Sequence, residues 1–330
     1  RAVIVLGMLL VRTRGMVWLA FPLLLVETVM AAFFEPARNA VIPNITSESG
    51  LLVANTLSSV TWSFNLAIGA TLGGLAAVLL GRGLVFALNS FSFLASAWLI
   101  SGMQFRESHL AAAPPLRGRD LADFSPVLEG VRYMRGNPRL FATVFVKAGL
   151  GFMGANNVIL PLLGERVFPV RLAGMEPHRG AMLGMSLLMG ARGVGALLGP
   201  FVSGVWAGAR QSRLRTGILA GFLMASAGYV AVGFCGSAAP AIAAVILAHC
   251  GGSTVWVFST TLLQRYTEDR YRGRVFSAEL GLCMLTISAS SYLAGAAVDL
   301  GVPVQRFAIG MGLSMLLPAA IWLFALRHDP

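Results

Sequence analysis

Charged residues are scarce in this chain: they make up 12% of its 330 residues, against about a quarter in an ordinary soluble domain. Hydrophobic residues supply 56%, and the mean hydropathy is +0.75. Apolar runs of about 20 residues, the length that crosses a bilayer, recur along the whole chain, so one cleaved signal peptide does not explain them. The composition predicts an all-α polytopic membrane protein, with the lipid bilayer as its first partner.

Cysteine, histidine and lysine are also rare, which argues against most site chemistries. The three cysteines lie in apolar runs without CxxC spacing, so neither a disulfide framework nor a metal site is indicated. Lys147 is the single lysine, and no glycine-rich loop ends in a lysine that could hold a phosphate, which excludes nucleotide-driven pumping within this chain. Without clustered intramembrane His, Asp or Cys, we expect no catalytic residues, no enzyme activity and no cofactor.

The formal net charge of +11 raises the question of a nucleic-acid partner. The basic residues, however, lie between the apolar runs, and they form no stripe interleaved with aromatic side chains. Basic loops of this kind are typical of membrane topology. We therefore expect no nucleic-acid binding.

The apolar runs predict nine complete membrane spans. Residues 1–11 are apolar but too short to cross, and the sequence opens with Arg1 rather than methionine. The simplest interpretation is a fragment that begins inside an earlier helix. The expected spans are 17–36, 51–79, 84–103, 140–163, 180–206, 216–235, 239–264, 275–299 and 304–326.

Alternate loops differ in their arginine content, which predicts the orientation because basic residues are retained in the cytoplasm. One set carries 15 arginines and the other carries 7. The richer set faces the cytoplasm, together with the C-terminal residues 328–330. It comprises Arg38, Arg106, Arg117, Arg119, Arg132, Arg135, Arg139, Arg210, Arg213, Arg215, Arg265, Arg270, Arg272, Arg274 and Arg327.

The longest cytoplasmic segment divides the expected spans into two groups. Within it, apolar residues recur at helical spacing over 121–137, which predicts an amphipathic helix along the membrane surface, with Phe124, Val127, Leu128 and Val131 toward lipid or protein. The expected division is the remainder of an N-terminal bundle (1–104), a cytoplasmic connector (105–139) and a C-terminal six-helix bundle (140–330).

Six segments together resemble the major facilitator superfamily, and more narrowly its bacterial drug and siderophore exporter branch, the enterobactin-exporter-like group. They follow one another in the family's order and cover nearly the whole chain. The segments are AFFEPARNAVIP (32–43), LVANT (52–56), IGATLGG (68–74), NNVILPL (156–162), GVGALLG (193–199) and RGRVFS (272–277).

The resemblance implies twelve helices in two bundles, with this chain starting partway through the third. It further implies a monomeric secondary transporter of the bacterial inner membrane, which exports small amphipathic compounds by alternating access with protons as the coupling ion. The family's antiporter signature has Gly-Pro before its closing glycines, whereas Gly69 is followed by Ala70, so antiport stays open. The alternatives are a lysophospholipid flippase or uniporter of the same fold, and a non-transporting fragment or scaffold.

Three charged residues fall at membrane depth, where a charge costs about 2.5 to 3.5 kcal/mol and therefore marks a candidate functional site. Glu27 is the candidate proton carrier, and Arg192 is a candidate for substrate binding or coupling. The alternative for these two is a structural ion pair with each other. Lys147 either takes part in substrate binding or proton coupling at membrane depth, or extends its long side chain to the cytoplasmic interface.

Polar and small residues complete the set of candidates. Asn65 and Asn157 either hydrogen-bond a substrate or join helices. The resemblance implies a cytoplasmic gate of Glu35 and Arg38 with Arg272 and Arg274. Glycines spaced four apart predict close helix contacts. The resemblance implies that these helices form the seam between the bundles, and the alternative is tight packing without motion. These glycines are Gly69, Gly73, Gly74, Gly195 and Gly199.

Overall fold

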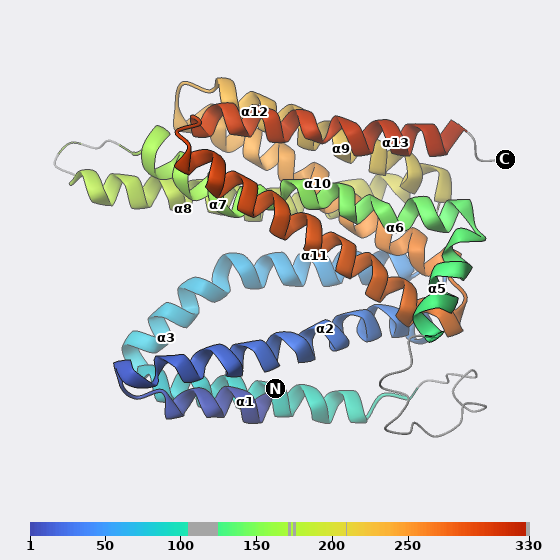
Figure 1. Ribbon diagram of the computed structural model, residues 1–330, viewed down its shortest axis with the longest axis horizontal. Coiled ribbons are helices and arrows are strands. Elements are labelled where there is room, and N and C mark those ends of the chain that lie inside the picture. Colours follow the sequence, from blue (N-terminus) through green and yellow to red (C-terminus); the bar gives the residue numbers. More distant parts are fainter. Residues whose placement is uncertain (105–124, 171–172, 174–175, 209, 328–330) are drawn as a thin grey trace.

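The computed structural model describes residues 1–104, 125–170, 173, 176–208 and 210–327 (Figure 1). The described residues form helices and contain no strand. Eight helical segments among them are long and apolar enough to cross a membrane. The expected all-α polytopic membrane fold is thereby confirmed.

The N-terminal half supplies one group of helices. It contains α1 (Ala2–Gly7), α2 (Ala20–Ile45) and α3 (Leu51–Ser101), with short 3-10 turns at Met8–Leu10 and Arg14–Leu19. The expected spans 51–79 and 84–103 are the two halves of α3, which bends at Gly81. Gly81 has φ 77°, a left-handed conformation that a residue with a side chain rarely adopts. A single glycine therefore replaces the expected loop.

The C-terminal half supplies the second group of helices. Its first span is broken into four short pieces that follow one another without a loop. Asn137 starts this span, because its side chain accepts a hydrogen bond from the Leu140 amide. The elements are α6 (Pro138–Leu150), η4 (Gly151–Ala155), α7 (Asn156–Leu162), η5 (Leu163–Val167), α8 (Pro177–Ala207), α9 (Gln211–Phe234), α10 (Ala238–Tyr266), α11 (Asp269–Asp299), α12 (Val304–Ser314) and α13 (Leu316–Arg327).

Helix α10 forms the centre of this second group and packs against both α9 and α8. Phe222 and Tyr229 of α9 and Phe258 of α10 have no exposed surface. A Cβ added at Gly228 would lie 2.6 Å from the Ala244 carbonyl oxygen, so the backbones of α9 and α10 are in direct contact. This close packing makes the C-terminal group a compact body.

The two groups of helices meet at one end and diverge toward the other (Figure 1). Across the boundary, α3 contacts α8 and α10, and α2 contacts α11. The meeting end holds the C-terminal end of α2, the start of α3 and the start of α11. It also holds α5 (Ser125–Arg135), the described part of the expected connector helix.

Helix α5 is attached to the start of α11. Tyr133 stacks on Tyr271 with ring centroids 4.1 Å apart, and the Tyr133 hydroxyl accepts a hydrogen bond from the Glu268 amide. Leu128 is exposed, whereas Val131 packs against the cluster that contains Met134. Phe124 and the side chain of Val127 lie outside the described residues. The alignment of α5 with the membrane surface stays a prediction.

Candidate functional site between the helix groups

A buried amide network joins α2, α3 and α10 where the groups meet. The Asn55 amide donates to Thr261 Oγ1 at 3.0 Å and to Gln264 Oε1 at 2.6 Å. Gln264 Nε2 in turn donates to the Asn39 carbonyl oxygen at 2.9 Å. Asn55 and Gln264 are 5% and 1% exposed, so these hydrogen bonds are shielded from water.

A second network joins α2 to the start of α11. Arg272 Nη1 donates to Asn44 Oδ1 at 2.8 Å and to Asp269 Oδ1 at 2.9 Å. The Asn44 amide also donates to Asp269 Oδ1. We refer to the residues of both networks together as the junction. They are Asn39, Asn44, Asn55, Thr261, Gln264, Asp269 and Arg272.

The expected gate residues are only partly brought together. Arg272 lies in the junction. Arg274 pairs instead with Glu129 of α5 at 2.7 Å, and Glu35 pairs with Arg38 one turn along α2 at 3.0 Å. The Glu35 and Arg38 side chains are 41% and 44% exposed. Their role in gating stays a prediction.

Lys147 forms a buried ion pair that connects α6 and α11. Its ammonium lies 2.9 Å from Glu279 Oε2, and the two side chains are 3% and 2% exposed. The ammonium also lies 4.4 Å from the ring centroid of Trp256 on α10, in a cation–π contact. Of the two alternatives for Lys147, the structure favours a position at depth, because its ammonium is buried and paired where it lies.

This pair sits deep in the helices. Lys147 is the tenth residue of α6, and Glu279 is the eleventh of α11, which places both about 15 Å from the helix starts. Glu279 was missed in the sequence because it follows Arg274 closely and lies near the beginning of span 275–299. Its Oε1 atom is buried and has no hydrogen-bond partner within the described part of the chain.

Arg192 lies at the middle of α8, 15 residues from either end. Its Nη1 donates to Asn157 Oδ1 of α7 at 2.8 Å. The Tyr229 hydroxyl and His249 Nε2 lie 2.7 Å apart, and both groups are within electrostatic range of the Arg192 guanidinium. The structure therefore brings together two expected site residues, Arg192 and Asn157, with a buried Tyr–His pair.

Glu27 does not pair with Arg192. Its carboxylate lies 3.4 Å from the Arg1 guanidinium, and the Glu27 side chain is 23% exposed. Glu27 belongs to α2 and Arg192 to α8, in different helix groups.

The expected glycine seam needs a correction. A Cβ added at Gly69 or Gly73 of α3 would meet nothing within 4 Å, and the surroundings of Gly74 lie outside the described residues. Gly195 and Gly199 do pack tightly, but against the backbone of α10 within the same helix group. Asn65 of α3 is exposed. Close contact between α3 and α8 occurs instead near Gly204, where an added Cβ would lie 3.5 Å from Thr56 Oγ1.

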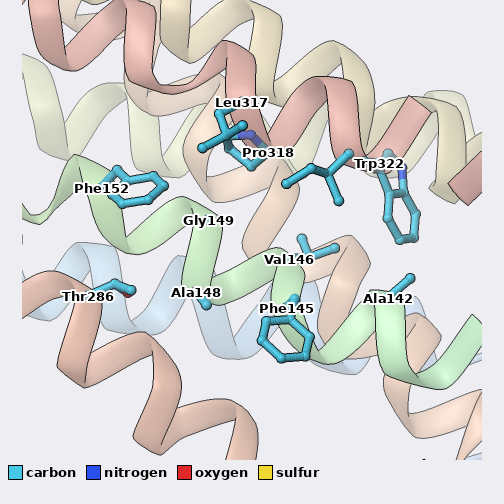
Figure 2. Close-up of a pocket in the computed structure, with 11 residues that line it drawn as sticks. Ala142, Phe145, Val146, Ala148, Gly149, Phe152, Thr286, Leu317, Pro318 and Trp322 are labelled. Carbon is cyan, nitrogen blue, oxygen red and sulfur yellow. The ribbon is translucent and has the colours of Figure 1, made fainter. Parts of the chain in front are cut away.

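A hollow of about 200 Å³ lies between α6 and α13, beside α11 (Figure 2). Its lining includes Phe145 of α6, Phe152 of η4, and Pro318 and Trp322 of α13. The hydroxyl of Thr286 donates to backbone oxygens of its own helix. The hollow offers no free polar group to orient a ligand, so the charged residues at membrane depth are the stronger candidates.

Two groups of membrane-length helices, joined at one end by a polar junction and carrying charges at membrane depth, define a secondary transporter fold. The chain belongs to the Major Facilitator Superfamily, whose family model matches residues 1–279. A search of curated proteins gave no match.

Solved transporters share this fold at low sequence identity. The structure of FucP in its outward conformation is 15% identical, with a TM-score of 0.62 over 88% of this chain and 72% of FucP. An outward-facing bacterial homologue of the iron transporter ferroportin is 16% identical, with a TM-score of 0.64 over 96% and 75% of the two chains. A variant of the E. coli fucose:proton symporter FucP is 17% identical, with a TM-score of 0.57 over 88% of this chain and 73% of that chain. These likenesses establish the fold alone.

Proposed function

We propose that this chain belongs to a proton-coupled exporter of the bacterial inner membrane that moves small amphipathic compounds, of the drug or siderophore class, by alternating access. The meeting end carries α5 with Arg132 and Arg135 and the start of α11 with Arg270, Arg272 and Arg274, so the positive-inside rule supports a cytoplasmic location for it. The junction then closes the cytoplasmic side, and the diverging ends face outward. Opening of the junction would present the same interior to the cytoplasm.

The observation that best supports coupling is the buried Lys147–Glu279 pair. In the structure the Lys147 ammonium neutralises the Glu279 carboxylate, and breaking such a buried pair costs about 3–5 kcal/mol. Protonation of Glu279 would leave the Lys147 ammonium buried without a counter-ion. The protonated transporter would therefore favour a conformation in which water reaches Lys147, which links proton binding to a change of access.

Glu27 remains a second candidate proton carrier, and its surroundings differ from those of Glu279. Glu27 is partly exposed and pairs with Arg1 in the N-terminal group, whereas Glu279 is buried in the C-terminal group. In our scheme Glu279 carries the coupling proton and Glu27 holds α1 against α2. A substitution at each carboxylate tests this assignment.

The experiment is transport by the full-length protein in inside-out vesicles, with and without an imposed pH gradient. Dansylglycine and its neutral amide serve as fluorescent amphipathic probes, so the result does not depend on probe charge. We expect the gradient to accelerate uptake by the unmodified protein and by Glu165→Gln, a control at an exposed carboxylate. Glu279→Gln should reduce uptake to the rate without a gradient, and Glu27→Gln should keep the acceleration.

Normal gradient-driven uptake by Glu279→Gln would refute the coupling role. If the single variant fails to fold, the double variant Lys147→Met with Glu279→Gln removes both charges and should fold but remain uncoupled. A gradient that has no effect on the unmodified protein would indicate a uniporter or a flippase, and would refute proton coupling altogether.

A further inference from the structure

The Arg192 guanidinium carries a charge that no described carboxylate neutralises. It lies at the middle of α8, far from either helix end, so its side chain cannot reach the membrane surface. Its recorded hydrogen bond goes to the neutral amide of Asn157. Within the described part of the chain, the structure records no ion pair for Arg192.

Among the described residues, the groups around Arg192 supply no negative charge. The Tyr229 hydroxyl and the His249 imidazole bond to each other, and at neutral pH neither of these residue types is ordinarily an anion. By contrast, Lys147 has a carboxylate at 2.9 Å in the same helix group. Among the described residues, Lys147 thus has an internal counter-ion at membrane depth and Arg192 has none.

The Arg192–Asn157 pair is also accessible. Arg192 is partly exposed and Asn157 is exposed. With Asn157 Oδ1 accepting from Arg192, the Asn157 amide nitrogen and the remaining guanidinium N–H groups are left as donors. Donors arranged in this way match the two oxygens of a carboxylate.

From this geometry we infer that Arg192 and Asn157 bind the anionic group of the substrate, and that the transported compounds are amphipathic organic monoanions of the carboxylate class. The inference rests on the proposed function for the transport step, but binding itself is independent of coupling. The apolar part of the substrate would be removed from water, while its carboxylate would supply the counter-ion that α8 lacks.

The test is an equilibrium fluorescence titration of the full-length protein in detergent, without any proton gradient. Dansylglycine and its neutral amide are nearly equal in size and differ in the carboxylate. A hydrogen bond between two charged groups contributes more to binding than a hydrogen bond to a neutral group. We therefore expect dansylglycine to bind at least about tenfold more tightly than its amide. Equal affinity of the two probes would overturn the inference and would leave the proposed exporter function intact.

Two substitutions locate the effect. Arg192→Gln removes the cation, and Asn157→Asp places an internal carboxylate where the amide oxygen now lies 2.8 Å from Arg192. Each should abolish the preference for dansylglycine, and the near-isosteric Asn157→Asp should do so in a protein that folds normally. Arg306→Gln, at an exposed arginine of α12, is the control and should keep the preference.

Retention of the preference in Asn157→Asp or Arg192→Gln would overturn the assignment of these residues. Acetate added in competition separates a simple anion site from a substrate site. We expect acetate to displace dansylglycine only at far higher concentration, because it lacks the apolar part. Displacement by equimolar acetate would contradict the amphipathic class.

Discussion

Among single residues, the charges at membrane depth show most clearly what sequence reasoning can and cannot supply. Hydropathy placed Lys147, Glu27 and Arg192 within long apolar helices, where the structure also has them, and of the three only Lys147 is buried. It did not give their partners, because position along a helix fixes depth but not the neighbour that the side chain faces. Glu279 pairs with Lys147 across 132 residues of sequence, and only the packing of α6 against α11 reveals it.

The ion pair makes a prediction about stability. Lys147→Met and Glu279→Gln each leave one buried charge or polar group without its partner, so each should destabilise the protein by about 3–5 kcal/mol. The double variant leaves no charge and should recover most of that loss. Thermal unfolding of the purified proteins in detergent measures the effect. Single variants as stable as the unmodified protein would show that the pair does not hold α6 and α11 together.

At the scale of elements, glycine spacing alone does not identify a helix contact. Gly69 and Gly73 have the same four-residue spacing as Gly195 and Gly199. In the structure, Gly195 and Gly199 pack against the α10 backbone. A Cβ added at Gly69 or Gly73 would touch no other atom. Spacing identifies a face on which a close contact is possible, and the fold decides which of these faces is used.

Alanine substitutions distinguish the two kinds of glycine. At Gly199 a Cβ would collide with the Cys250 carbonyl oxygen, a backbone atom that cannot move easily, so Gly199→Ala should destabilise the protein by about 1–3 kcal/mol. Gly69→Ala should be neutral or slightly stabilising, because alanine favours helix. The midpoint of thermal unfolding in detergent reports both. Equal losses at the two positions would contradict the packing of α8 on α10.

At the scale of the whole molecule, the six spans of the C-terminal half and the membrane fold itself were predictable, because long apolar runs have few other structures available. The bend at Gly81 was expected as a loop, since hydropathy does not distinguish a short turn from a kinked helix. The junction was not predicted beyond Arg272. Its residues lie more than 200 positions apart in pairs such as Asn55–Gln264, and ordinary amides near helix ends carry no distinctive sequence signal.

In the proposed mechanism transport requires the junction to open, and a reversible cross-link across the junction tests this most directly. In a protein with Cys235, Cys250 and Cys283 replaced, Asn44→Cys and Asp269→Cys place two thiols where the native side chains now hydrogen-bond at 2.9 Å. The control pair, Ser203→Cys with Thr254→Cys, joins α8 and α10 within one helix group, where the native hydroxyls lie 3.1 Å apart.

Transport of the dansyl probes is then measured after oxidation and again after reduction. We predict that oxidation of the Asn44–Asp269 cysteine pair stops transport and that reduction restores it, because α2 and α11 must separate in each cycle. The Ser203–Thr254 cysteine pair should transport normally in both states. Undiminished transport by a fully cross-linked Asn44–Asp269 cysteine pair would contradict alternating access through this junction.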